Sequence, residues 1–95
     1  KDDYVLNHIF VGDDDQKVLL QLDKELGAEN IRKHSEMVLY HMPKQMRRVF
    51  ELFTEHQFGI AEIAKIHNST VQEIESLLKT ARKSLRTSFI KRYLD

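Results

Sequence analysis

The sequence of 95 residues contains no cysteine, one proline and three glycines. Without cysteine the chain forms no disulfide bond, no thiolate metal site and no cysteine nucleophile, which fits a reducing cytoplasm. No run of apolar residues approaches the roughly 20 that a membrane-spanning helix needs, and no signal-peptide pattern opens the chain. We therefore expect a cytoplasmic protein that has no membrane partner.

Motifs for catalysis and for cofactor binding are also missing. The sequence has no glycine-rich loop that would cradle a phosphate, no nucleophile elbow and no pair of catalytic carboxylates. The run Asp13-Asp14-Asp15 lacks the alternating ligands and the closing glutamate of a calcium loop. The five histidines show no spacing typical of metal ligands; they are His8, His34, His41, His56 and His67. We expect no enzyme activity, cofactor, metal or small-molecule substrate.

The charges are distributed unevenly along a chain whose formal net charge is zero. Residues 1–42 hold five basic and nine acidic side chains, whereas residues 43–94 hold ten basic and five acidic ones, so the net charges are −4 and +5. Such an asymmetry suits a basic face on nucleic acid, although an ordinary solvated surface gives the same count. The chain begins at Lys1 rather than Met, so we expect it to be part of a longer protein.

The first 42 residues predict an arm and two packing helices. Residues 4–11 are apolar and form either a short helix or an extended arm. The aspartates at 13–15 are good N-cap residues for a helix from about Gln16, which would end at Gly27 in the C′ position. A second helix is expected over residues 29–42. The apolar positions of the two helices are Val18, Leu19, Leu22 and Leu26, then Ile31, Val38, Leu39 and Met42.

The remaining residues predict three more helices. Pro43 fits the first position of a helix because its missing N–H group has no partner there. The spacing of Met46, Val49, Phe50 and Phe53 gives that helix one apolar face, and Phe58-Gly59 ends the pattern. A short helix follows, with Ile60, Ile63, Ala64 and His67. The last helix has apolar positions at Val71, Ile74, Leu78, Ala81 and Leu85, and this pattern can be extended to Phe89.

The turn at residues 67–70 joins the last two helices through very few residues. Asn68 tolerates the left-handed conformation, and Ser69 or Thr70 can cap the helix that follows. The sequence therefore predicts an all-α fold, a small helical bundle that contains a helix-turn-helix with a long C-terminal recognition helix. Residues 1–42 are expected to form the arm and packing helices and residues 43–95 the helix-turn-helix unit, within one compact domain.

The second half of the chain contains a run of motifs in fixed register, which are MPKQMRRVFEL at 42–52, EIA at 62–64, Val71, Leu78 and ARK at 81–83. With these motifs it resembles region 4 of bacterial sigma-70 family factors, most closely the extracytoplasmic-function type. It implies a transcription initiation domain that recognises the −35 promoter element through its recognition helix and docks on the β-subunit flap of RNA polymerase. An anti-sigma protein is a further candidate partner.

The candidate DNA-binding residues lie on the polar side of the last helix and on the helix that braces it. Base or phosphate contact is expected for five residues of the polar face, which are Gln72, Glu73, Ser76, Lys79 and Lys83. Thr70 is expected to be a helix cap with a secondary role as a phosphate donor. Arg47 matches an arginine of the family, but a salt bridge to a glutamate explains it equally well. A structural or phosphate role is favoured for Arg82.

Four positions of the reading helix depart from the family and support a rival hypothesis. Glu73 and Glu75 stand where a small or hydroxyl residue and a lysine are usual, and Leu77 and Thr80 stand where arginine is frequent. A degenerate helix-turn-helix that binds polymerase, an anti-sigma protein or a second copy of itself is therefore the alternative. A third hypothesis is the output domain of a response regulator, which has a similar four-helix shape.

Overall fold

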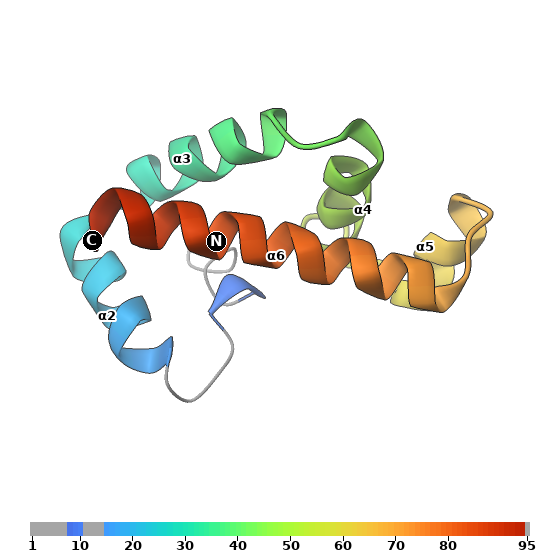
Figure 1. Cartoon of the computed structure of the whole chain (residues 1–95), viewed down its shortest axis with the longest axis horizontal. Helices are drawn as coiled ribbons and strands as arrows, with labels where there is room; N and C mark the ends of the chain where they lie inside the picture. Colours follow the sequence, from blue (N-terminus) through green and yellow to red (C-terminus); the bar gives the residue numbers. More distant parts are fainter. Residues whose placement is uncertain (1–7, 11–14, 95) are drawn as a thin grey trace.

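The computed structural model describes residues 8–10 and 15–94 of the chain. These residues contain helices and no strand, which confirms the predicted all-α class (Figure 1). The helices are α2 (Gln16–Glu25), α3 (Ala28–Tyr40), α4 (Lys44–Thr54), α5 (Ile60–Ile66) and α6 (Val71–Tyr93). None of the helices described is both long and apolar enough to cross a membrane.

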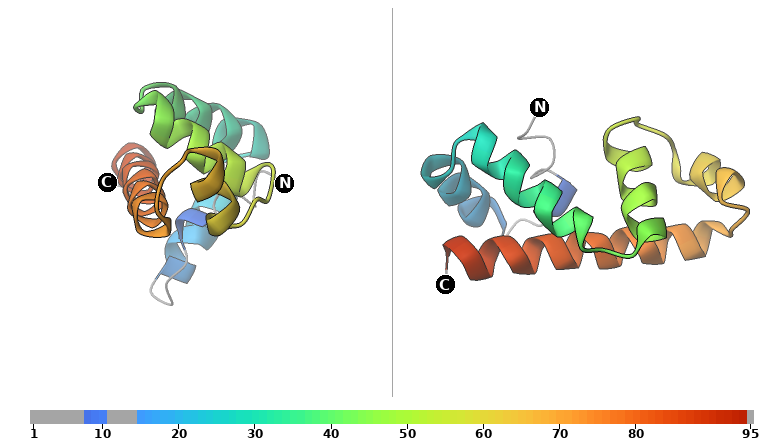
Figure 2. Two further views of the ribbon diagram at one scale, coloured as in Figure 1. Left: turned by 90° about the vertical axis from the view of Figure 1, so that its right-hand side faces the viewer. Right: turned by 90° about the horizontal axis from the view of Figure 1, so that it is seen from above.

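Helix α6 runs through the whole molecule and carries the core. Its 23 residues extend about 35 Å at the usual helical rise. Helices α4 and α5 pack along its N-terminal half, whereas α3 packs along its C-terminal half, near α2 (Figure 2). Its buried side chains recur every three or four residues and are Ile74, Leu78, Ala81, Leu85 and Phe89. The predicted stripe is therefore confirmed from Ile74 to Leu85, and so is its extension to Phe89.

The N-terminal segment is attached to α6 at Arg86. Of the predicted arm, the structure describes residues 8–10, in which Ile9 and Phe10 are buried. Asp15 is the N-cap residue of α2, but its side chain makes no capping hydrogen bond. Instead, Nη2 of Arg86 donates a hydrogen bond to Oδ1 of Asp15, and the guanidinium carbon of Arg86 lies 5.7 Å from the centre of the Phe10 ring. Asp13 and Asp14 lie outside the described residues.

One predicted helix boundary is confirmed and another is wrong. Gly27 follows the C-cap Leu26 and so occupies the predicted C′ position of α2. Its φ and ψ of −82° and 165° are not left-handed, and it is also the N-cap of α3. Helix α2 already ends at Glu25, because Leu26 becomes extended and buries its side chain. Pro43 is the N-cap of α4 rather than its first helical residue, with ψ at 141°. The proline φ is compatible with either place, so the sequence alone did not separate them.

The left-handed conformation predicted for Asn68 is confirmed, with φ at 52°. A second left-handed residue, Gln57, was not predicted and has φ at 57°. It lies in the connection between α4 and α5, where the N–H of Phe58 donates to the carbonyl of Leu52. This bond closes the end of α4 immediately before the break at Phe58-Gly59.

His34 is a buried histidine that links α3 to the end of α6. Its Nε2 lies 2.9 Å from the hydroxyl oxygen of Ser88, and its ring meets the rings of Phe89 and Tyr93 edge-on at 4.5 and 5.4 Å. Burial lowers the pKa of His34 below its usual 6.5, and the charge of Arg92 lowers it further. The neutral imidazole is therefore the form that the fold accommodates.

This burial predicts that the domain loses stability in mild acid. The unfolded chain binds more protons than the folded chain once the pH falls below 6.5, because the folded state lowers the pKa of His34. The free energy of unfolding should therefore be greatest above pH 6.5 and decrease as the pH falls towards the lowered pKa. Urea unfolding at a series of pH values measures this dependence.

The variant His34→Gln should show a weaker dependence of the unfolding free energy on pH. The exposed His41 of the same region offers a matched control, and His41→Gln should behave as the original chain does. An equal pH dependence for His34→Gln and for the original chain would show that His34 is not responsible.

Candidate nucleic-acid interface

The turn between α5 and α6 is fixed by backbone hydrogen bonds. The N–H of Ser69 donates to the carbonyl of Ala64 at 2.8 Å, and the N–H of Asn68 donates to the carbonyl of Lys65 at 3.2 Å. Ala64 is 5% exposed, as expected for a small residue where two helices approach closely. The left-handed Asn68 then reverses the chain. Together these contacts set α6 at a defined angle to α5, which is the helix-turn-helix arrangement.

Thr70 and Glu73 form a reciprocal capping box at the start of α6. The hydroxyl oxygen of Thr70 accepts from the N–H of Glu73 at 3.1 Å, and Oε1 of Glu73 accepts from the N–H of Thr70 at 2.8 Å. The predicted cap is therefore Thr70 rather than Ser69. This arrangement gives Glu73 a structural reason to be acidic, and it leaves the hydroxyl proton of Thr70 to donate to another group.

The polar face of α6 contains four exposed side chains in one row. They follow each other at intervals of four, three and four residues and are Gln72, Ser76, Lys79 and Lys83. The helical rise places the two ends of this row about 16 Å apart along the axis. Neither lysine forms an ion pair with a carboxylate of the described residues. Their charges are therefore available to a ligand.

Two apolar residues near the start of α6 lie outside its buried stripe. Val71 is 44% exposed, so its assignment to the core stripe is wrong; it is the first residue of the helix, and the buried stripe begins only at Ile74. Leu77 is half-buried and packs against the core. It is therefore not a bare hydrophobic residue on a polar face.

Two adjoining grooves lie between α4 and the helix-turn-helix. The first is lined by Lys44, Gln45, Arg47, Arg48, Glu51 and His67. The second is lined by Gln45, Ser69, Thr70, Gln72, Glu73, Ser76, Leu77 and Thr80. Because Gln45 belongs to both, the grooves form one continuous surface. The first groove is rich in cations, and the second contains no lysine or arginine.

Sequence reasoning identified only part of this surface. It named the arginines of the first groove but missed Lys44, Gln45 and His67. The available signal was the concentration of basic residues in the first five positions after Pro43. Of the candidates on α6, the second groove brings together Thr70, Gln72, Glu73 and Ser76, while Lys79 and Lys83 continue the polar face beyond it.

The two arginine candidates lie against aromatic rings. The guanidinium carbon of Arg47 is 5.9 Å from the centre of the Tyr40 ring, and no carboxylate of the described residues forms an ion pair with Arg47. The salt-bridge alternative is therefore not supported. Arg82 is half-buried, 5.8 Å from the centre of the Phe53 ring, and lines neither groove. Its contact with Phe53 fits the structural role.

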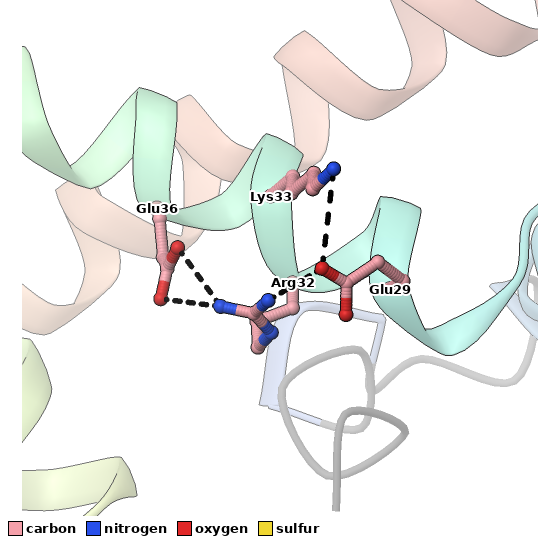
Figure 3. A network of polar contacts seen from close by, with 4 residues as sticks. All are labelled: Glu29, Arg32, Lys33 and Glu36. Atoms are coloured by element: carbon pink, nitrogen blue, oxygen red, sulfur yellow. Dashed lines mark hydrogen bonds and ion pairs between the residues drawn. The ribbon is translucent and has the colours of Figure 1, made fainter.

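Charged side chains on α3, in the acidic half of the chain, form ion pairs with one another. Nη2 of Arg32 lies 2.6 Å from Oε2 of Glu29, and Nη1 of Arg32 lies 3.2 Å from Oε2 of Glu36 (Figure 3). Nζ of Lys33 lies 3.9 Å from the same oxygen of Glu29. All four side chains are exposed, so the network contributes little stability. It balances two cations against two carboxylates, and this surface therefore carries little net charge. No group of three or more potential metal ligands occurs in the described part of the chain.

Comparison with known families adds an independent line of evidence. A family model described as Sigma-70, region 4 matches residues 36–85. The match includes the last part of α3, all of α4 and α5, and α6 as far as Leu85, which is more than half of the chain. The chain belongs to the sigma-70 region 4 family. Comparisons with curated proteins and with solved structures gave no match.

Membership of the family gives the domain its general role. Sigma-70 region 4 is a DNA-binding helix-turn-helix domain of the transcription machinery, so this domain has a sigma-factor-like role in binding DNA. The matched residues contain both grooves completely. The unmatched residues include α2 and the end of α6, which the Asp15–Arg86 ion pair joins.

The capping box yields a test of how α6 begins. Thr70→Ala removes the acceptor for the N–H of Glu73 and should lower the free energy of unfolding by about 1 kcal/mol. Thr70→Ser keeps the hydroxyl oxygen and should lower the free energy of unfolding much less. Glu73→Gln keeps an oxygen that accepts from the N–H of Thr70, so its free energy of unfolding should also change little. Urea unfolding compares the three variants, and equal midpoints for Thr70→Ala and Thr70→Ser would contradict the capping role.

Proposed function

We propose that this domain recognises the −35 promoter element by placing the start of α6 in the major groove, and that it docks on RNA polymerase through an adjoining apolar surface. The observation that carries the proposal is the continuity of the two grooves. A cationic groove on α4 meets a polar groove on α6 at Gln45, and the second groove has no lysine or arginine; both belong to a helix-turn-helix of the sigma-70 region 4 family.

The two grooves suit different parts of a DNA duplex. Lysine and arginine side chains hold phosphates, whereas the first residues of a recognition helix contact base edges. We assign phosphate contacts to Lys44, Arg47 and Arg48 on α4. Gln72 and Ser76 then face the bases. Lys79 and Lys83 lie farther along α6, where they would contact phosphates at the edge of the groove.

The acidic residues of the reading helix do not oppose this assignment. Glu73 is occupied in part by the capping box. Five cations of α4 and α6 are assigned to phosphates. The carboxylates near this surface are fewer and are those of Glu51, Glu73 and Glu75. The balance of charge therefore favours a polyanion. The second groove supplies mainly hydrogen-bonding groups, and Glu73 is its one charged side chain.

A third groove supports docking on a protein. It is lined by Met37, Val38, His41, Met42, Pro43 and Met46 from α3, α4 and their connection, and by Thr80, Ser84 and Ser88 from α6. Met37 is 49% exposed and the neighbouring Tyr40 is 73% exposed. Methionine side chains adapt well to an apolar partner surface. Because Thr80 lines this groove and the second one, polymerase and DNA would be held side by side.

Charge reversal on α6 tests the DNA contact. The double variant Lys79→Glu, Lys83→Glu removes two phosphate contacts and adds repulsion, so the affinity for promoter duplexes should fall at least about ten-fold. The slope of log affinity against log salt concentration should also decrease by about two. Fluorescence anisotropy over a range of salt concentrations measures both quantities.

A matched control changes the net charge by the same amount elsewhere. Lys24 and Lys33 are exposed on α2 and α3, away from the grooves, and Lys24→Glu, Lys33→Glu should nearly preserve the salt slope. If both double variants lost affinity equally, the effect would be one of net charge, and the assigned phosphate contacts would be wrong.

A further inference from the structure

The reading surface of α6 has an unusual chemical composition for a DNA-binding helix. Residues 71–78 contain no lysine or arginine, and the first cation of α6 is Lys79. The second groove instead offers amides from Gln45 and Gln72, hydroxyl groups, and the side chain of Leu77. Its one carboxylate, Glu73, has Oε1 bound to the N–H of Thr70.

Each base pair is recognised in the major groove by particular side chains. Arginine and lysine pair with the O6 and N7 atoms of guanine, glutamate accepts from the N4 of cytosine, glutamine pairs with the N6 and N7 atoms of adenine, and apolar side chains contact the thymine methyl group. The groove lacks the guanine-reading groups and holds its carboxylate in the cap. The side chains that remain favour adenine and thymine.

We infer that α6 reads A·T base pairs directly, with Gln72 bound to the N6–H and N7 of an adenine and Leu77 against the methyl group of a thymine. This inference rests on the proposed placement of α6 in the major groove. Gln72 and Leu77 are five positions apart, which corresponds to about 7.5 Å along the helix, or about two steps of a DNA duplex. The inference also gives a role to the part of the Leu77 side chain that is exposed in the second groove, which would contact the thymine methyl group.

The experiment uses the complete chain and duplexes selected from a randomised library. The selected sequences should contain an adenine and a thymine at fixed spacing. Replacing that thymine with uracil removes only its methyl group and should weaken binding about four-fold. Replacing the adenine with 7-deazaadenine removes the N7 acceptor and should weaken binding about five-fold or more.

Protein variants connect each base to its reader. Gln72→Ala should bind the adenine and 7-deazaadenine duplexes equally, and Gln72→Arg should select guanine in place of that adenine. Gln72 is exposed, so neither change removes a core contact. Leu77→Ala should remove the difference between thymine and uracil. Leu77→Met, which preserves volume, is the control for folding.

The outcomes separate this inference from the proposal on which it rests. Salt-sensitive binding with a guanine preference, or with no preference, would overturn A·T reading and leave the DNA-binding role intact. An A·T preference that both base analogues leave unchanged would indicate recognition of DNA shape and would also overturn the direct contacts. No salt-sensitive binding to any duplex would overturn both.

Discussion

Burial of one stripe along α6 is the constraint on which the other features of this domain depend. Ile74, Leu78, Ala81, Leu85 and Phe89 are each 1% exposed or less. Burying a large apolar side chain contributes about 1.5–3 kcal/mol, so a rotation of α6 that exposed this stripe would be strongly disfavoured. The opposite face is thereby fixed towards solvent, and the core of the domain determines which polar residues of α6 are exposed on it.

Paired and unpaired charges lie in different parts of the molecule. At the C-terminal end of α6, Arg86 is paired with Asp15, and on α3 the cations are paired with glutamates. At the N-terminal end, the cations of α4 and the two lysines of the polar face form no ion pair within the described residues. Residues that precede the family match thus contact α6, while the matched residues carry the surface that we assign to nucleic acid.

The parts of this structure that the sequence predicted are those determined by near neighbours. The spacing of the α6 stripe, the cap at Thr70 and the left-handed Asn68 depend on residues only a few positions apart. The contacts of Asp15 with Arg86 and of His34 with Ser88 join residues separated by 71 and 54 positions, and no local pattern indicates them. For the same reason Lys44 and His67 were missed, since the wall of their groove depends on how α4 packs against the turn. Val71 was misplaced because the spacing of apolar residues does not show where neighbouring helices stop covering α6.

The central claim is that one face, formed by the start of α4, the turn and the first half of α6, receives the DNA. The most direct measurement is a two-dimensional amide NMR titration of the chain with a promoter duplex. The account predicts that the largest chemical-shift changes occur at residues 44–48 and 67–77 and at Lys79 and Lys83, with small changes in α2 and the first half of α3. Large changes concentrated in α2 and α3, with little effect on residues 67–77, would contradict it.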